Sequence, residues 1–219
     1  MLPALDDTAD RFAALVTTAP DPAVRGRGHN HQQIRALGTA SAGELADRMR
    51  QDLAALRDQI QGYGTQMPAF RFHGGEKIRA DAALGILLGE LVVHGHDVAG
   101  ALGRPWPIDP AHAALIIEGL NPILPGWVRP DRVKGLTARF ELRLRGQARH
   151  VWAFRAGQLH VNPPGPRRID VHISADPAGL LLVLYARESQ WKHIATGRLT
   201  AWGRRPWLAF TLTSRFHKP

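Results

Sequence analysis

The sequence predicts an α+β protein, in which a helical N-terminal domain is followed by a small domain with a mainly antiparallel sheet. Up to about residue 121, apolar residues recur at helical spacing, and from residue 140 they alternate with polar ones as in strands. The stretch ILPGWVRPDRVKG, residues 123–135, contains several turn-type residues and is expected to connect the two parts. The predicted domains are therefore residues 1–128 and 136–219.

Four helices are predicted in the first domain, because apolar residues recur every three or four positions between turn-type segments. The second helix follows Ser41, which forms a capping-box pattern with Glu44. The fourth follows Asp109-Pro110, an N-cap residue and a proline suited to the first helical turn. These helices cover about residues 2–16, 45–60, 80–102 and 110–121.

The second domain is predicted because apolar residues now recur at every second position, as they do in strands. Phe140, Leu142 and Leu144 alternate with charged residues, and a hairpin is expected around Ala156-Gly157. Alternation returns at residues 169–173, and helices are expected over about 178–187 and 190–195. The pattern favours a strand at 198–202 and leaves 206–216 open between strand and helix.

The composition limits the possible chemistry and location. The chain has 219 residues and no cysteine, so any metal ion must be held by histidine and carboxylate side chains. No uninterrupted apolar run approaches the ~20 residues of a membrane-spanning helix. The first residues, MLPALDDTAD, lack the basic start and apolar core of a secretory signal. We therefore expect a cytoplasmic protein with no membrane partner.

The positive charge is concentrated in the second half of the chain. Residues 131–219 contain 16 Lys and Arg against 5 Asp and Glu, whereas residues 1–130 contain 12 against 14. Such asymmetry raises the question of a nucleic-acid partner. The basic residues are scattered among strand-like segments and form no block, so we expect no nucleic acid. A DNA- or RNA-associated module is kept as the third hypothesis.

The segment LLGELVVHGHDVAGALG, residues 87–103, carries the most informative chemistry. On a helix, Glu90, His94 and Asp97 project from one face. A carboxylate among apolar neighbours is costly unless a cation offsets it, and a divalent ion shared with the imidazole would do so. Asp97 would complete the site or bind the other imidazole nitrogen. A simple Glu–His hydrogen bond, or an exposed polar stripe, is the alternative interpretation.

Two segments resemble one known family. GELVVHGHDVAGALGRPWPIDP resembles the metal-binding helix and following turn of the mycothiol-dependent maleylpyruvate isomerase family, whose N-terminal domain is a DinB-like helical bundle. Glu90 and His94 match two metal ligands of that family. Residues 171–210 resemble the sterol-carrier-protein-like domain that follows the bundle in many members. The resemblance covers most of residues 40–216.

The resemblance implies a metal- and mycothiol-dependent isomerase or thiol transferase that acts on a small anionic substrate such as maleylpyruvate. Zinc would be the metal, and mycothiol the thiol cosubstrate. Arginine binds carboxylates through bidentate hydrogen bonds, so basic residues of the second domain are expected to hold the substrate. The candidates for this role are Arg198, Arg204 and Arg205.

The sequence departs from the family at its start. Members usually open with a helix that carries a third histidine ligand, and residues 1–40 contain no match, so we expect the first bundle helix to be missing. His29, His31 and His73 are the candidates to replace that ligand, because each lies in or beside a predicted loop. The second hypothesis follows from this departure. It is a non-catalytic small-molecule or lipid-binding protein with a degraded metal site.

Overall fold

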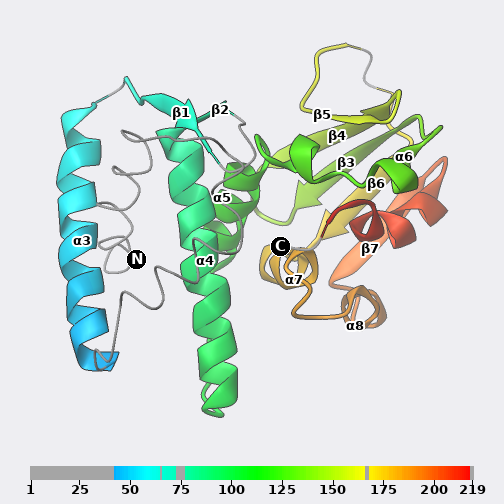
Figure 1. The fold of residues 1–219 in the computed structure, drawn as a ribbon. Helices are drawn as coiled ribbons and strands as arrows, with labels where there is room; N and C mark the ends of the chain where they lie inside the picture. Colours follow the sequence, from blue (N-terminus) through cyan, green and yellow to red (C-terminus); the bar gives the residue numbers. More distant parts are fainter. Residues whose placement is uncertain (1–41, 65, 73–76, 166–167, 218–219) are drawn as a thin grey trace. The chain divides into compact units, whose positions relative to one another are not determined.

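The computed structural model describes residues 42–64, 66–72, 77–165 and 168–217 (Figure 1). The predicted helix at 2–16 lies outside these residues. The described part is an α+β fold with a mostly antiparallel sheet, as the sequence predicted. Contacts divide the chain into two compact units, Met1–Ala83 and Leu84–Pro219. The domain division predicted at 128–136, and the DinB-like bundle, stay predictions.

The described part of the first unit contains one long helix and a short hairpin. Helix α3 spans Ala42–Gly62 and includes the predicted helix at 45–60. Strand β1 (Ala69–Arg71) pairs antiparallel with β2 (Lys77–Arg79). This hairpin was not predicted, because strands of three residues are too short to show an alternation of apolar and polar residues. The backbone nitrogen of Ala80 donates to the Pro68 carbonyl at 2.9 Å, which joins the hairpin to the start of the next helix.

Helices α4 (Ala80–Ala101) and α5 (Pro110–Leu120) form where the sequence predicted them. Asp109 caps α5, since its side chain accepts a hydrogen bond from the backbone nitrogen of Ala111 at 2.7 Å. The two helices meet at glycines. A Cβ atom added at Gly85 would lie 2.8 Å from the Leu115 carbonyl oxygen and 2.9 Å from the Gly119 Cα. Only a residue without a side chain allows this backbone contact.

Helix α4 is the one described helix that is long and apolar enough to cross a membrane by length and composition. This is weak evidence, because a core helix of a folded domain passes the same test. The close contact with α5 at Gly85 buries one side of α4. The predicted cytoplasmic location stays a prediction.

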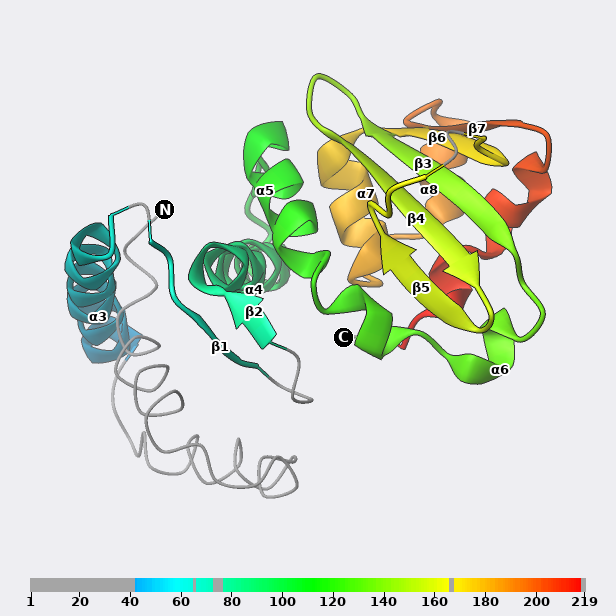
Figure 2. The same cartoon turned by 90° about the horizontal axis from the view of Figure 1, so that it is seen from above.

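The second unit is built on a five-stranded sheet in the order β5-β4-β3-β6-β7 (Figure 2). Neighbouring strands are antiparallel except β3 and β6, which are parallel. Phe140 pairs with Trp152 and Val171, and Leu142 with Ile173, so large apolar side chains lie on one face. The strands are β3 (Ala138–Leu144), β4 (Arg149–Arg155), β5 (Gln158–Val161), β6 (Val171–Ala175) and β7 (Leu199–Gly203).

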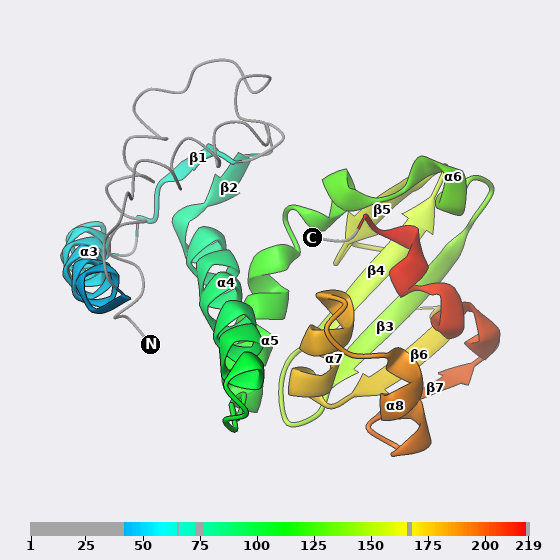
Figure 3. The same ribbon diagram turned by 60° about the horizontal axis from the view of Figure 1, so that its bottom comes forward.

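Helices cover the apolar face of this sheet, and none of the described helices of the second unit covers its other face (Figures 2 and 3). Helix α7 (Pro177–Leu184) starts directly after β6, where Asp176 accepts a hydrogen bond from the Gly179 nitrogen at 2.9 Å. Helix α8 (Gln190–Ala195) follows. Residues 206–216, for which the sequence did not decide between strand and helix, form two 3₁₀ helices, η5 (Pro206–Thr211) and η6 (Thr213–Arg215). The segment between α5 and the sheet contains η4 (Leu124–Trp127) and α6 (Pro130–Val133).

The α4–α5 contact generates a stability prediction. Gly85→Ala is expected to lower the free energy of unfolding by roughly 1–3 kcal/mol, because the new methyl group overlaps the backbone of α5. Gly100→Ala is the control, since nothing lies within 4 Å of a Cβ there. It should raise the free energy by at most about 1 kcal/mol through better helix propensity. Urea unfolding followed by circular dichroism measures both changes, and equal effects would contradict the close contact.

Candidate functional site

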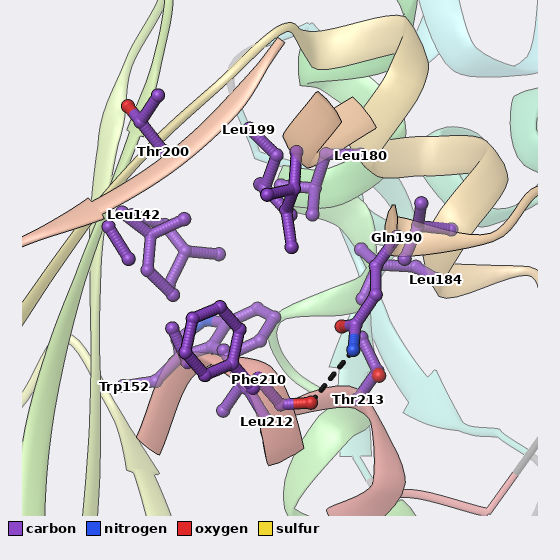
Figure 4. Close-up of a pocket in the computed structure, with 15 residues that line it drawn as sticks. Leu142, Trp152, Leu180, Leu184, Gln190, Leu199, Thr200, Phe210, Leu212 and Thr213 are labelled. Atoms are coloured by element: carbon purple, nitrogen blue, oxygen red, sulfur yellow. Dashed lines mark hydrogen bonds between the residues drawn. The ribbon is translucent and has the colours of Figure 1, made fainter. Parts of the chain in front are cut away.

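An apolar cavity of about 290 Å³ lies between the sheet and the helices that cover it (Figure 4). Leu142 and Trp152 of the central strands line it from the sheet, and Phe210 of η5 lines it as well. The residues that line it are Leu142, Trp152, Ile173, Leu180, Val183, Leu184, Gln190, Ile194, Leu199, Thr200, Ala201, Ala209, Phe210, Leu212 and Thr213.

The composition of α7 explains why an apolar space forms here. Its sequence, PAGLLLVL, has no polar side chain, and a helix that is apolar on all sides must be covered on all sides. Leu180 and Val183 line the cavity, whereas other parts of α7 contact α5. The helix is eight residues long and α8 is six, so neither covers the whole apolar face of the sheet. An apolar space therefore remains beside the sheet.

The polar groups of the cavity are few and uncharged. Gln190, Thr200 and Thr213 are the polar residues among those that line it, and none of the described lining residues is charged. The Gln190 side-chain nitrogen donates to the Phe210 carbonyl oxygen at 2.8 Å, which ties α8 to η5 (Figure 4). The described lining residues supply no carboxylate, imidazole or amine that could act as a general acid or base. What the cavity can do is exclude water and bind an apolar group.

A buried hydrogen-bond network includes Trp152, which lines the cavity. The Trp152 indole nitrogen donates to the Asn121 side-chain oxygen at 3.2 Å, and the Asn121 amide nitrogen lies 3.1 Å from His150 Nδ1. Because the amide is a donor here, Nδ1 must accept, and the imidazole is neutral. Burial lowers the pKa of His150, and the negative charge of Glu118 opposes this shift in part. Protonation of His150 would remove the acceptor of the Asn121 amide and so weaken the network that positions Trp152.

The two predicted metal ligands lie together on α4. The distance between Glu90 Oε2 and His94 Nε2 is 3.1 Å, and their side chains are 51% and 64% exposed. The expected apolar environment of Glu90 is therefore wrong. The apolar side of α4 packs against its neighbours at Gly89 and not at Glu90. A Cβ added at Gly89 would lie 2.6 Å from the Tyr185 hydroxyl and 2.9 Å from an Ile116 methyl. Glu90, one position later, points outward.

Asp97 binds an arginine instead of completing a metal site. Arg187 donates to both of its carboxylate oxygens, with the shortest distance 2.7 Å, and this bond lowers the pKa of Asp97. His94 Nδ1 lies 3.6 Å from the same carboxylate, beyond a good hydrogen bond. Over the described ranges, no three His, Asp or Glu side chains are grouped closely enough to hold a metal ion. His29, His31 and His73 lie outside the described residues.

The predicted substrate arginines lie elsewhere in the second unit. Arg204 follows β7, and its guanidinium is 3.7 Å from the Asp170 carboxylate. Arg205 donates to the Thr137 carbonyl oxygen at 2.8 Å. Arg198 is exposed between α8 and β7. The arginine bound to the polar cluster on α4 is Arg187, which sequence reasoning missed because no motif surrounds it. The proposed roles of the three arginines stay predictions.

Comparison with known proteins gives structural matches only. No protein-family model and no curated protein matches this chain. A solved structure described as UbiJ-SCP2, a ubiquinone synthesis protein, is 18% identical and covers 50% of this chain and 92% of its own, with a TM-score of 0.36. Sterol carrier protein 2 from Yarrowia lipolytica, in its apo form, is 14% identical, with a TM-score of 0.35. The match covers 49% of this chain and 91% of the carrier protein.

A third match is the sec-alkylsulfatase Pisa1 from Pseudomonas sp., at 12% identity and a TM-score of 0.37. It covers 96% of this chain, which spans only 43% of the sulfatase. Two of the structures similar to this chain are thus described as proteins of the sterol-carrier type. Membership of the maleylpyruvate isomerase family stays a prediction.

The buried imidazole generates a prediction on pH. The pKa of His150 is lower in the folded than in the unfolded protein, so its contribution to stability is complete above the unfolded pKa of about 6.5 and is lost as the pH falls below it. His150→Gln should therefore lose less free energy of unfolding between pH 7 and pH 5 than the wild type. His160→Gln, on exposed strand β5, is the control and should follow the wild type. Parallel curves for all three proteins would contradict this role.

Proposed function

We propose that this protein binds a small apolar or amphipathic molecule, such as a lipid, in the cavity of its second unit. The observation that carries the proposal is the cavity itself, about 290 Å³ in volume and lined by aliphatic and aromatic side chains. This volume is near the lower end of the range of roughly 300–1,000 Å³ for small-molecule sites. It suits one hydrocarbon chain or one compact ring system better than a large sterol.

The chemistry of the lining supports an apolar ligand over an anionic one. Burying apolar surface is favourable by roughly 25 cal/mol per Å², whereas a carboxylate placed there would lose its hydration without gaining a charged partner. Of the polar lining residues, Gln190 and Thr213 lie on one side of the cavity and Thr200 on another, and each can serve only an uncharged or weakly polar group (Figure 4). A small dianion such as maleylpyruvate has no place in such a cavity.

A variant that fills the cavity tests the proposal. Ala201 lines it from β7, and its partner across the strands is Ile173, another lining residue. Ala201→Phe should weaken binding of a fluorescent fatty-acid analogue by at least about tenfold, equivalent to about 1.4 kcal/mol. The matched control is Ala148→Phe, in the exposed turn between β3 and β4. Fluorescence titration measures both affinities.

Native mass spectrometry gives a second readout on the same proteins. A co-purifying apolar molecule should be found on the wild type and on Ala148→Phe, and should be lost from Ala201→Phe. If the wild type binds neither the probe nor any co-purifying molecule, or if the two variants bind the probe equally, the cavity is not a binding site and the proposal is wrong.

A metal- and mycothiol-dependent isomerase or thiol transferase, acting on a small anionic substrate, is the second candidate. One observation favours it, since Glu90 and His94 lie within 3.1 Å of each other on an exposed helix face. The described residues supply only these two ligands, because Asp97 is bound by Arg187. Zinc sites commonly have three or four protein ligands, so a third would have to come from outside the described ranges.

Metal analysis tests this second candidate. Purified wild-type protein should contain more zinc than Glu90→Ala or His94→Ala, because each variant removes one of the two ligands. Asp97→Ala is the control, and it should keep the metal if Asp97 only pairs with Arg187. Equal metal content in the wild type and the two ligand variants would remove the basis of the isomerase hypothesis and leave the binding function untouched.

A further inference from the structure

Phe210 lines the cavity and is exposed, and two more exposed aromatic residues, Trp191 and Trp207, lie on the elements that line it, α8 and η5. We name Trp191, Trp207 and Phe210 the aromatic rim. Their relative exposures are 58%, 58% and 45%, which are high values for side chains of this size. We propose that the aromatic rim docks on an anionic phospholipid surface, from which the apolar ligand reaches the cavity. This inference rests on the proposed binding function.

The rim residues form one continuous patch. The rings of Trp191 and Phe210 are stacked, with centroids 5.6 Å apart and planes inclined by 23°. Trp207 precedes Phe210 by three positions in the 3₁₀ helix η5. Because a 3₁₀ helix has three residues per turn, these two side chains point to the same side. Two elements, α8 and η5, therefore present one aromatic surface.

The patch is continuous with the cavity. Phe210 both lines the cavity and belongs to the rim. Gln190, the first residue of α8, also lines the cavity and holds the Phe210 backbone through its hydrogen bond of 2.8 Å. Trp191 is the next residue along α8. An apolar ligand that leaves the cavity on this side therefore meets aromatic side chains before it meets water.

The charge around the rim identifies the kind of surface. Residues 189–217 contain no Asp or Glu and five Lys or Arg, which are Lys192, Arg198, Arg204, Arg205 and Arg215. Two of these charges are partly offset from outside the segment, because Lys192 pairs with Glu188 and Arg204 lies 3.7 Å from Asp170. Arg215 is buried, whereas Arg198 and Arg204 are exposed. Basic residues near an anionic bilayer each contribute favourably to binding, and Trp side chains are enriched at the level of the lipid headgroups. Exposed tryptophans within a basic segment match that boundary.

Single-stranded nucleic acid is the other polyanion that combines basic and aromatic side chains. The structure favours a lipid surface, because the rim adjoins an apolar cavity without charged lining. A stacking site for bases has no need of such a cavity. Nucleic acid is therefore one of the outcomes that the experiment must separate.

Cosedimentation with vesicles tests the inference on the full chain. Phosphatidylcholine vesicles containing phosphatidylglycerol should bind the protein, and pure phosphatidylcholine vesicles should bind it more weakly. Trp191→Ala and Trp207→Ala should each weaken binding to the anionic vesicles by on the order of tenfold, because each removes one amphipathic ring from the contact. Trp202→Ala is the matched control. Trp202 is 42% exposed, but it lies on the other face of the sheet, stacked on His172.

The results distinguish failure of this inference from failure of the binding function. The rim variants should keep their affinity for the fatty-acid analogue within about twofold, since neither tryptophan lines the cavity. If the wild type binds the analogue but no vesicle, the cavity function stands and the docking surface is wrong. An equal loss in Trp202→Ala also overturns the inference, as does binding to a single-stranded oligonucleotide that vesicles do not displace.

Discussion

The fold of the second unit depends on burying a helix that has no polar side chain. Asp176 starts α7 directly after β6, so the helix must run across the apolar face of the sheet. The sheet covers one side of α7, and α5 contacts another. Because α7 and α8 together contain few turns, they leave part of the face to η5 and to the cavity. The cavity follows from the same apolar surface that holds the unit together, so binding and stability share one cause.

Local signals were sufficient to predict most elements of the second unit. Alternation marked β3 and the β4–β5 hairpin, and Asx-Pro pairs marked the starts of α5 and α7. The parallel pairing of β3 with β6 left no local signal, because the two strands are separated by a whole hairpin. Residues 206–216 have no single period, and the packing of Leu212 and Phe216 against the rest of the unit decides their 3₁₀ form.

The candidate site was harder to predict, for a geometric reason. Apolar neighbours in sequence suggested a buried Glu90, but adjacent positions on a helix point in different directions, and Tyr185 occupies the apolar side at Gly89. The partner of Asp97 lies 90 residues away in Arg187. The cavity is lined from strands, α7, α8 and the 3₁₀ helices η5 and η6, so no single segment contains a motif for it. The spacing of Glu90 and His94 did predict that the two side chains lie together.

The sequence alone did not indicate a partner for the positively charged second half of the chain. The aromatic rim suggests one, an anionic lipid surface. The sequence led us to expect no membrane partner, on the ground that no spanning segment was found. The proposed docking departs from that expectation, because peripheral contact requires only a few amphipathic side chains beside basic ones. A carrier of an apolar molecule must pass it between water-separated compartments without exposing it. In the proposed docking, an anionic bilayer would cover the path of the ligand where Trp191 and Phe210 lie stacked beside the cavity.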